Sequence, residues 1–571
     1  MKNFADVTTR IEFANFLDVP LKKLTYVLYS KQCENLYISF EIPKKNGNVR
    51  CINAPMNDLK DIQQNLAKIL INHQQNIRNE NNISPNISHA FEKNKSIITN
   101  AKIHRNKRFV FNTDLKDFFD HFHFGRVCGF FEKNRHFQFP KEIAVIIAQL
   151  ACYKGSLPQG APTSPIITNL ICEILDFRLL KLAKEYKLDF TRYADDLTFS
   201  TNNPSFEDQF ASFKYKLQLE IEHAGFKIND TKSRLQFRDS RQEVTGLIVN
   251  KKINTKKEYS KNTRAMARQL YTQGFFTINN EIGTINQLEG RFSFINQIDL
   301  YNNRIDVNIG SDKKHDFWNL SSRERQYQQF LFYKYFFANP KPFIITEGKT
   351  DPVYIKAALK NLYHEFPNLI EKNEDDSFMF KISFLRRTKR LSYFLNLQVD
   401  GADTIKNLYN FFARDKSTGG KYPCYFEILK RMNSNIPPNN PVIFLFDNEL
   451  SNPKKPLANF ANCIKLNDQK KISLENNNKI NIFGNLYLLT HQLINNHSEC
   501  EIEDLFDTDT LNSKIDEKSF SRKDSFDVNK FYGKQIFSQY IEQHYLDINF
   551  DNFRPLLNNI NEIIAEYKSI N

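Results

Sequence analysis

Two adjacent carboxylates stand at the centre of a short hairpin-like stretch. Residues 190–200 read Phe-Thr-Arg-Tyr-Ala-Asp-Asp-Leu-Thr-Phe-Ser, so strand-forming residues flank Asp195 and Asp196 on both sides. Adjacent carboxylates repel, and a hard cation such as Mg²⁺ relieves that repulsion while leaving coordination positions for substrate phosphates. Side chains alternate along a strand, so the pair can converge on one site only with a third ligand from elsewhere. The alternative is an ordinary solvent-exposed Asp-Asp turn, with Arg192 as the nearest cation.

An upstream apolar run includes another carboxylate, Asp114. A turn-rich Leu-Pro-Gln-Gly-Ala-Pro segment at 157–162 lies between this run and the Asp-Asp stretch. The order of the three segments resembles the palm of reverse transcriptases. The resemblance implies that Asp114, Asp195 and Asp196 hold two Mg²⁺ ions for nucleotidyl transfer, with Asp114 bridging both. In such chemistry one ion activates the attacking hydroxyl and the other stabilises the departing pyrophosphate.

A basic hairpin precedes this palm. Two strand-like runs between 37 and 52 are joined by Lys-Lys-Asn-Gly-Asn, which is a hairpin signal and places Lys44, Lys45 and Arg50 at or near its tip. Such cations suit a triphosphate, and Arg can contact it through two nitrogens. A solvated basic hairpin is the alternative, and the palm downstream favours nucleotide binding.

The palm resemblance also implies further nucleotide contacts. Phe119 would lie beneath the incoming sugar and select dNTPs, although core packing is its simpler interpretation. Gln159 and Gly160 would contact the template and nucleotide, where a glycine permits close backbone approach. Lys232 would lie near the triphosphate and help to protonate the pyrophosphate, and Asn169 is a weaker candidate for the same pocket.

Two short markers narrow the family. Asn100-Ala101-x-x-His104 precedes the palm strands, and Val244-Thr245-Gly246-Leu247 follows them. The pair resembles elements of retron reverse transcriptases. The resemblance implies a bacterial, cytoplasmic enzyme that binds its own noncoding RNA (msr/msd) through these residues. It also implies priming from a guanosine 2′-OH and a branched RNA–DNA product, msDNA. A mobile-element or abortive-infection reverse transcriptase is the alternative, and a noncatalytic nucleic-acid-binding scaffold is another.

The segment from 260 to 273 predicts an amphipathic helix. Lys261, Arg264 and Arg268 share one face, and apolar residues occupy the other. A cationic face suits the backbone of a template–primer duplex. A merely solvated face is the alternative.

The second half of the chain carries another set of carboxylates. An apolar run ends at Glu347, with Asp351 four residues later, and a second apolar run ends at Asp447-Asn448-Glu449. Carboxylates that follow parallel strands lie where α/β sheets place their sites. The pattern resembles a TOPRIM domain.

Two later features sharpen this resemblance. Glu503, in Glu501-Ile502-Glu503-Asp504, and Lys534 look most like TOPRIM nucleases of the overcoming-lysogenization-defect type, which implies a site for Mg²⁺ or Mn²⁺. Glu449 stands where an Asp is usual, so a structural, noncatalytic domain is the alternative. An apolar run at 395–399 before Gly401 is expected to be the second strand of this sheet.

The whole chain is long and basic. Its 571 residues suggest two to four domains, and its net charge of +14 suits a polyanionic partner. It shows no signal pattern and no apolar run of membrane-spanning length. Its eight cysteines contain no C-x-x-C, which indicates reduced thiols.

These elements predict an α+β right-hand polymerase followed by an α/β TOPRIM domain with a mainly parallel sheet. The expected bounds are a helical N-terminus over 1–35, fingers over 36–105, palm over 106–255, thumb over 256–310, a linker or docking helix over 311–340 and the TOPRIM domain over 341–571. The fusion suggests an antiphage role in which msDNA restrains a toxic nuclease, because tethering raises the effective concentration of sensor and effector. Oligomerisation is one form that this restraint could take.

Overall fold

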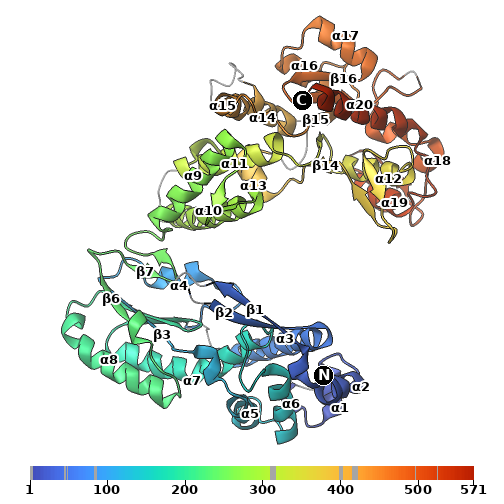
Figure 1. Cartoon of the computed structure of the whole chain (residues 1–571). Helices are drawn as coiled ribbons and strands as arrows, with labels where there is room; N and C mark the ends of the chain where they lie inside the picture. Colours follow the sequence, from blue (N-terminus) through green and yellow to red (C-terminus); the bar gives the residue numbers. More distant parts are fainter. Residues whose placement is uncertain are drawn as a thin grey trace. The chain divides into compact units, whose positions relative to one another are not determined.

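The computed structural model describes residues 4–43, 47, 49–82, 87–308, 317–397, 403–413, 422–495, 497–523 and 525–570, with the side chains of 304–308 left aside. The chain forms two compact units, Met1–Lys257 and Glu258–Asn571 (Figure 1). The division therefore falls at the start of the expected thumb and not at its end near 310. The reason is packing: Ala267, Leu270 and Phe292, from the thumb segment, share an apolar core with Phe330 and the rest of the second unit.

The first unit is built on a four-stranded antiparallel sheet in the order β4-β5-β3-β6. Strand β3 lies at its centre and pairs with both β5 and β6. Alternating bulky residues such as Phe111 and Phe199 are buried and pack with Phe213 and Leu175 from the covering helices. The strands are β3 (Phe109–Asp114), β4 (Asp189–Tyr193), β5 (Asp196–Thr201) and β6 (Arg234–Phe237), and the covering helices are α7 (Ser164–Glu185) and α8 (Phe206–His223).

The segments before the palm form helices and one hairpin. The predicted hairpin is confirmed, since β1 (Tyr37–Pro43) and β2 (Val49–Pro55) pair in antiparallel register. The helical N-terminus is also confirmed by α1 (Arg10–Phe16) and α2 (Leu21–Thr25). The remaining helices and the short hairpin of this unit are α3 (Asn57–Glu80), α4 (Ile97–Ile103), α5 (Phe124–Lys133), α6 (Lys141–Ala151), β7 (Glu243–Val244) and β8 (Leu247–Ile248).

The second unit contains a five-stranded sheet in the order β14-β11-β15-β17-β16. The first four strands are parallel and β16 is antiparallel, as the mainly parallel prediction requires. Strands β11 and β15 are buried along their whole length, which is typical of parallel sheets covered on both faces. The strands are β11 (Phe343–Thr346), β14 (Ser383–Phe384), β15 (Val442–Phe446), β16 (Lys479–Phe483) and β17 (Leu486–Thr490).

Helices and small hairpins surround this sheet. They are α9 (Lys257–Gln273), α10 (Ile285–Asn308), α11 (Ser322–Phe332), α12 (Asp351–Asn361), α13 (Lys389–Leu395), α14 (Asp403–Phe412), α15 (Tyr425–Met432), α16 (Pro456–Cys463), α17 (Asp468–Asn477), α18 (Thr508–Leu511), α19 (Lys534–Gln543), α20 (Arg554–Ile570), β9 (Thr277–Ile278), β10 (Glu281–Ile282), β12 (Ile370–Lys372), β13 (Phe378–Phe380), β18 (Ser519–Phe520) and β19 (Phe531–Tyr532). The expectation of a strand at 395–399 is wrong at Leu395, which ends helix α13, because β14 takes the place beside β11. Gly401 lies outside the described residues.

The structure also describes the state of the cysteines and the length and polarity of the helices. All eight cysteines are free thiols. None of the described helices is both long and apolar enough to cross a bilayer.

Candidate functional site

The palm sheet brings three predicted carboxylates to one end. Asp114 closes β3 and lies directly opposite Asp196 on β5, and the β4–β5 turn carries Asp195. The backbone carbonyl of Asp195 also accepts a hydrogen bond of 3.0 Å from the Leu115 amide, which fixes the turn against β3. Strand register therefore gathers the three acids that the sequence selected.

The three acids repel one another. Loss of hydration, followed by the charge of Asp114, raises the pKa of Asp195 to about 6. Loss of hydration, followed by the charges of Asp195 and Asp114, raises the pKa of Asp196 to about 7. Lys232 Nζ donates to Asp114 Oδ2 at 2.5 Å and offsets part of the repulsion. A crowded, oxygen-only ligand set under this repulsion fits a divalent cation.

Arg192 does not serve as the partner of the palm acids. Its side chain is fully buried and forms a two-pronged ion pair with Asp176 on α7, with contacts of 2.6 and 2.9 Å. It also donates to the backbone carbonyl of Ala194 at 3.2 Å and to Asn169 Oδ1 at 3.2 Å. Ala194 has a φ of 56°, a strained value for a residue with a side chain. Arg192 therefore supports the turn that carries Asp195, and Asn169 belongs to this support.

The Pro-Gln-Gly loop contacts the finger hairpin. The Asn53 amide on β2 donates to the Gln159 carbonyl at 2.8 Å. Gly160 has a φ of 120°, and a Cβ on it would lie 2.8 Å from both Asn53 O and Ile52 Cγ2. The close approach expected at Gly160 is thus to protein backbone. Phe119 is half-buried and packs edge-on against Phe118.

Lys44, Lys45 and Arg50 are the hairpin cations that were predicted to bind nucleotide. Arg50 is exposed on β2. Lys44 and Lys45 lie outside the described residues. The nucleotide-binding roles of all three remain predictions.

The two retron markers contact each other inside the first unit. Asn100 Oδ1 accepts from Thr191 Oγ1 at 2.5 Å, and Asn100 Nδ2 donates to Thr245 Oγ1 at 3.5 Å. The ring of His104 spans Thr191 Oγ1 and Ser200 Oγ, each at 2.7 Å. This arrangement ties strands β4 and β5 to the β7–β8 turn.

The expectation that the whole marker set contacts nucleic acid therefore needs correction. Asn100, His104 and Val244 are completely buried, so they cannot present their side chains to RNA or DNA in this structure. Thr245 and Gly246 form the β7–β8 turn with positive φ at both positions, and of the set only Gly246 is exposed. Because most of these residues are buried, they stabilise the packing of the first unit.

The amphipathic helix predicted over 260–273 is confirmed as α9. Lys261, Arg264 and Arg268 are exposed on it, whereas Ala267 and Leu270 are buried. This leaves a cationic face available to a polyanion, and its binding role remains a prediction.

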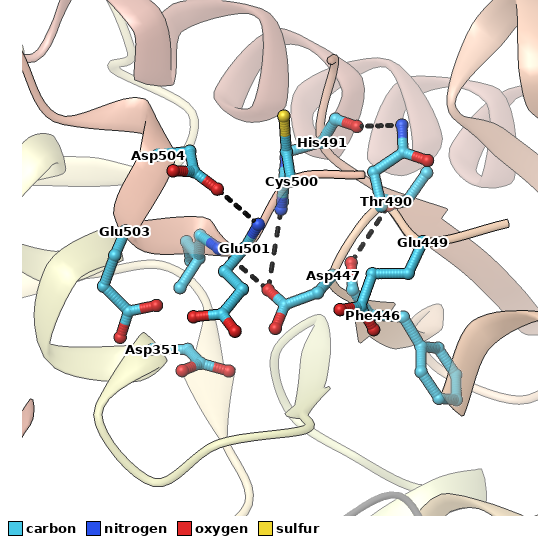
Figure 2. Close-up of polar contacts among 12 residues, drawn as sticks. Asp351, Phe446, Asp447, Glu449, Thr490, His491, Cys500, Glu501, Glu503 and Asp504 are labelled. Carbon is cyan, nitrogen blue, oxygen red and sulfur yellow. Dashed lines mark hydrogen bonds and ion pairs between the residues drawn. The ribbon is translucent and has the colours of Figure 1, made fainter. Parts of the chain in front are cut away.

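A second acidic cluster forms in the second unit. Glu347 and Asp351 follow β11, and Asp447 and Glu449 follow β15, at the carboxyl ends of neighbouring parallel strands. The segment before α18 adds Glu501 and Glu503. The carboxyl groups of Asp351, Asp447, Glu501 and Glu503 point toward one another (Figure 2).

Burial and mutual repulsion raise the pKa values in this cluster. Burial, then the charges of Asp447 and Glu449, raises the pKa of Glu347 to about 8. Burial, then the charges of Asp447 and Glu503, raises the pKa of Asp351 to about 7. Glu347 Oε2 is buried and finds no hydrogen-bond partner in the described chain. A buried, unpartnered carboxylate oxygen among other acids fits a cation that would complete it.

His491 was missed by sequence reasoning, because a lone histidine carries no motif. Its Nδ1 faces the Gln492 carbonyl at 3.1 Å, and a carbonyl can only accept, so Nδ1 carries a proton. Its buried Nε2 then lies 3.5 Å from Asp447 Oδ1 (Figure 2). This nitrogen has no hydrogen-bond partner in the described chain, and its approach to Asp447 places His491 with the cluster.

Two lysines compete with a cation for this site. Lys534 Nζ contacts both Glu501 Oε2 and Glu503 Oε2 at 3.1 Å. Lys455, also missed, donates to Glu449 Oε1 at 2.6 Å. Within the described ranges, no three His, Cys, Asp or Glu side chains already stand in a metal-holding arrangement. The donor set suits Mg²⁺ or Mn²⁺, and binding would require side-chain rotation and displacement of lysine.

Comparisons with known proteins match the first part of the chain to reverse transcriptases. A family model described as reverse transcriptase (RNA-dependent DNA polymerase) matches residues 42–259. Retron Ec86 reverse transcriptase of Escherichia coli is 30% identical over 287 residues, which cover 50% of this chain and 83% of that protein. Retron Mx65 reverse transcriptase of Myxococcus xanthus is 33% identical over 251 residues, covering 41% of this chain and 56% of that protein.

Coverage of the relatives is partial. The chain spans about half the length of the two Myxococcus xanthus proteins, 56% of the Mx65 enzyme and 52% of the Mx162 enzyme. Among solved structures, a telomerase from Candida albicans aligns with a TM-score of 0.33 and 12% identity over 52% of this chain and 64% of that one.

Proposed function

The chain belongs to the retron reverse transcriptase family, and we propose from this that its first unit is an RNA-directed DNA polymerase. It would bind a cognate noncoding RNA, start from a guanosine 2′-OH and use dNTPs to make branched msDNA. The observation that carries the proposal is the strand register that sets Asp114 opposite Asp196 with Asp195 in the adjoining turn. Family membership weighs against the mobile-element alternative, and the complete acid set weighs against a noncatalytic scaffold.

The palm residues would hold the metal ions, fix the turn that carries Asp195 and supply a proton. Asp114, Asp195 and Asp196 would hold two Mg²⁺ ions, which when bound supply activation of the attacking hydroxyl and charge stabilisation of the leaving pyrophosphate. Arg192 would keep the Asp195 turn in its strained form through the Ala194 carbonyl. Lys232 would leave Asp114 when the ions bind and become a proton donor to the pyrophosphate.

Nucleic acid bound to the purified chain tests the polymerase proposal. The chain is expressed with its native upstream DNA, and its nucleic acid is treated separately with RNase and DNase. A discrete DNA joined covalently to RNA is expected, and it should be lost in the Asp195→Asn/Asp196→Asn double variant. Glu185→Gln, which alters an exposed surface ion pair, is the matched control and should retain the product. An unbranched or heterogeneous product, or one that survives the double variant, would refute the proposal.

For the second unit, we propose a TOPRIM-type, metal-dependent nuclease held in check by msDNA as an antiphage effector. Support comes from carboxylates after two adjacent parallel strands and from the buried, unpartnered Glu347 oxygen. Glu347, Asp351, Asp447, Glu449 and Glu503 would hold Mg²⁺ or Mn²⁺. Lys534 would then be free to contact the scissile phosphate.

A structural, noncatalytic domain is the second candidate for this unit. It is favoured by the ion pairs that Lys455 makes with Glu449 and that Lys534 makes with Glu501 and Glu503, because these pairs already neutralise part of the acid cluster. Glu449 would hold its lysine permanently in this interpretation.

Cleavage assays separate the two candidates. The full chain, with msDNA intact or digested away, is incubated with labelled DNA and RNA in the presence of Mn²⁺ or Mg²⁺. Cleavage is expected only after msDNA removal, and Glu347→Gln should abolish it. Glu562→Gln, at an exposed carboxylate paired with Lys479, is the control. Absence of metal-dependent cleavage would favour the structural candidate, and equal cleavage with intact msDNA would refute the restraint.

A further inference from the structure

A large basic cavity lies beside the acidic cluster of the second unit. Its volume is about 1060 Å³, just above the usual size of small-molecule sites, and its walls come from β11, the start of α12, β13, β14 and the start of α13. Six of its lining residues are cations and, among the described lining residues, none is an acid. They are Lys341, Lys349, Lys356, Arg386, Arg387 and Lys389.

Lys356 experiences the charge of its cationic neighbours. Partial burial, and next the charge of Arg386, lowers the pKa of Lys356, with Glu542 offsetting only part of this effect. In the described part of the chain, Lys356, Arg386 and Lys389 form no ion pair. Like charges whose repulsion is only partly offset destabilise the protein, and a polyanion would relieve this repulsion.

One wall of the cavity is aromatic. Phe378 and Phe380 on β13 and Phe384 on β14 line it and are half-buried, and Met379 is 45% exposed. Lys356 Nζ lies 5.4 Å from the Phe384 ring centre and 5.8 Å from that of Phe380. Partly exposed rings interleaved with cations are the surface on which unpaired bases stack.

The cavity is continuous with the acid-bearing loop after β11. Thr346 and Gly348 line it, so Glu347 stands between two of its wall residues. Arg387 donates to the carbonyls of Thr346 at 3.1 Å and Glu347 at 2.8 Å. The Gly348 amide donates to Asp351 Oδ2 at 2.8 Å. A strand seated in the cavity would thus have its backbone beside the proposed metal ligands.

We propose that this cavity binds single-stranded nucleic acid, with phosphates on the Lys and Arg side chains and bases against the Phe378–Phe384 wall. The inference deepens the nuclease proposed above and rests on it for the fate of the bound strand. Single strands are favoured over duplexes because the aromatic wall is recessed in a cavity. Bases in a duplex stack on one another and cannot reach such rings.

Photo-crosslinking to the full chain tests the binding site directly. The probes are oligo(dT) carrying 5-iododeoxyuridine and oligo(U) carrying 5-iodouridine, each single-stranded or annealed to its complement. Adducts are mapped to peptides by mass spectrometry, so binding by the first unit does not confuse the readout. Adducts in peptides that contain residues 378–389 are expected from single strands, and the DNA and RNA arms identify which sugar is preferred.

Variants outside the proposed metal ligands make the prediction quantitative. Arg386→Gln/Lys389→Gln should lower the crosslink yield in this segment about tenfold at physiological salt and reduce its salt dependence, because each lost phosphate contact removes about 0.7 from the logarithmic slope for single strands. Phe380→Leu keeps the wall apolar and should lower the yield by removing a stacking face. Lys430→Gln, an exposed charge on α15 outside the cavity, is the control.

The outcomes separate this inference from the nuclease proposal. Crosslinks in the segment without cleavage would keep the cavity assignment and refute the nuclease. Cleavage without crosslinks there, unaffected by Arg386→Gln/Lys389→Gln, would overturn the cavity assignment and leave the nuclease standing. Equal or stronger crosslinking from duplexes would overturn the single-strand assignment.

Discussion

Replacing Asp176 by Asn tests whether the palm turn depends on the arginine behind it. Asp176 lies on α7 and is 5% exposed, and its two oxygens accept from Arg192, which is fully buried. Asn keeps the size of the side chain but removes its charge and offers one acceptor oxygen in place of two. The substitution would therefore leave Arg192 as a buried cation without its counter-charge.

The expected cost follows from the burial of both groups. Removing one partner of a buried ion pair typically costs about 3–5 kcal/mol, whereas an exposed pair contributes about 0–1 kcal/mol. Since about 1.4 kcal/mol is a factor of ten, the opening equilibrium of this region should rise roughly 100- to 4000-fold. Polymerase activity should fall as well, because the Arg192 contact to the Ala194 carbonyl holds the turn that carries Asp195.

Amide hydrogen exchange measures this effect locally. Exchange in peptides covering β4 and β5 should accelerate strongly in Asp176→Asn, and Glu185→Gln should leave it nearly unchanged because the Glu185–Lys216 pair is exposed. A double variant, Asp176→Leu/Arg192→Met, should regain much of the protection without regaining activity. Equal exchange in Asp176→Asn and Glu185→Gln would refute the argument that this buried pair supports the turn.

Three further predictions concern acid, backbone and metal. Burial lowers the pKa of His104 from 6.5 to about 3, so the unfolded state binds more protons than the folded state between these values. The free energy of unfolding should therefore fall as pH drops from 6.5 toward 3. This pH dependence of stability should be flatter in His104→Gln. Gly160→Ala should cost about 1–3 kcal/mol of local stability through its positive φ and its clash with Asn53, seen as faster exchange of the Asn53 amide, and unchanged exchange would contradict it. Glu347→Gln should raise the melting temperature without metal by relieving repulsion, yet lose the stabilisation that Mn²⁺ gives the parent chain; equal Mn²⁺ stabilisation would exclude Glu347 as a ligand.

The sequence predicted the palm well because its information is local. Asp195 and Asp196 sit between strand-forming residues, and period-two alternation places the flanking Phe190 and Phe199 on the buried face. Strands β11 and β15 were likewise visible as short, largely apolar runs, whereas β14 and β17 were not predicted. Each strand could be predicted from its own segment, and the order of the three palm segments along the chain supplied the rest.

Long-range partners could not be predicted in this way. Arg192 lies three residues before Asp195, yet its counter-charge is Asp176 on another element, and only the packing of α7 against the sheet reveals the pair. Asn100 and Thr245 are 145 residues apart and meet because helix α4, which carries Asn100, packs against the β7–β8 hairpin. Polar residues in a motif suggest contacts with a ligand. Most of the polar marker residues are buried here and form hydrogen bonds within the protein instead.

The second unit carries an acidic cluster next to a basic cavity, so binding of a metal ion and binding of nucleic acid should be coupled. Asp447 and Glu449 act on Glu347, and the residues on either side of Glu347 in the chain line the basic cavity. Repulsion within each group destabilises the protein. A metal ion would relieve the repulsion among the acids, and a nucleic-acid strand would relieve the repulsion among the cations. A phosphate at the boundary would contact both the ion and the cavity, and each ligand should therefore bind more tightly when the other is present. Linkage makes this coupling reciprocal: Mn²⁺ should increase the oligo(dT) affinity, measured by titrating the crosslink at residues 378–389, by the same factor as the oligonucleotide increases Mn²⁺ affinity.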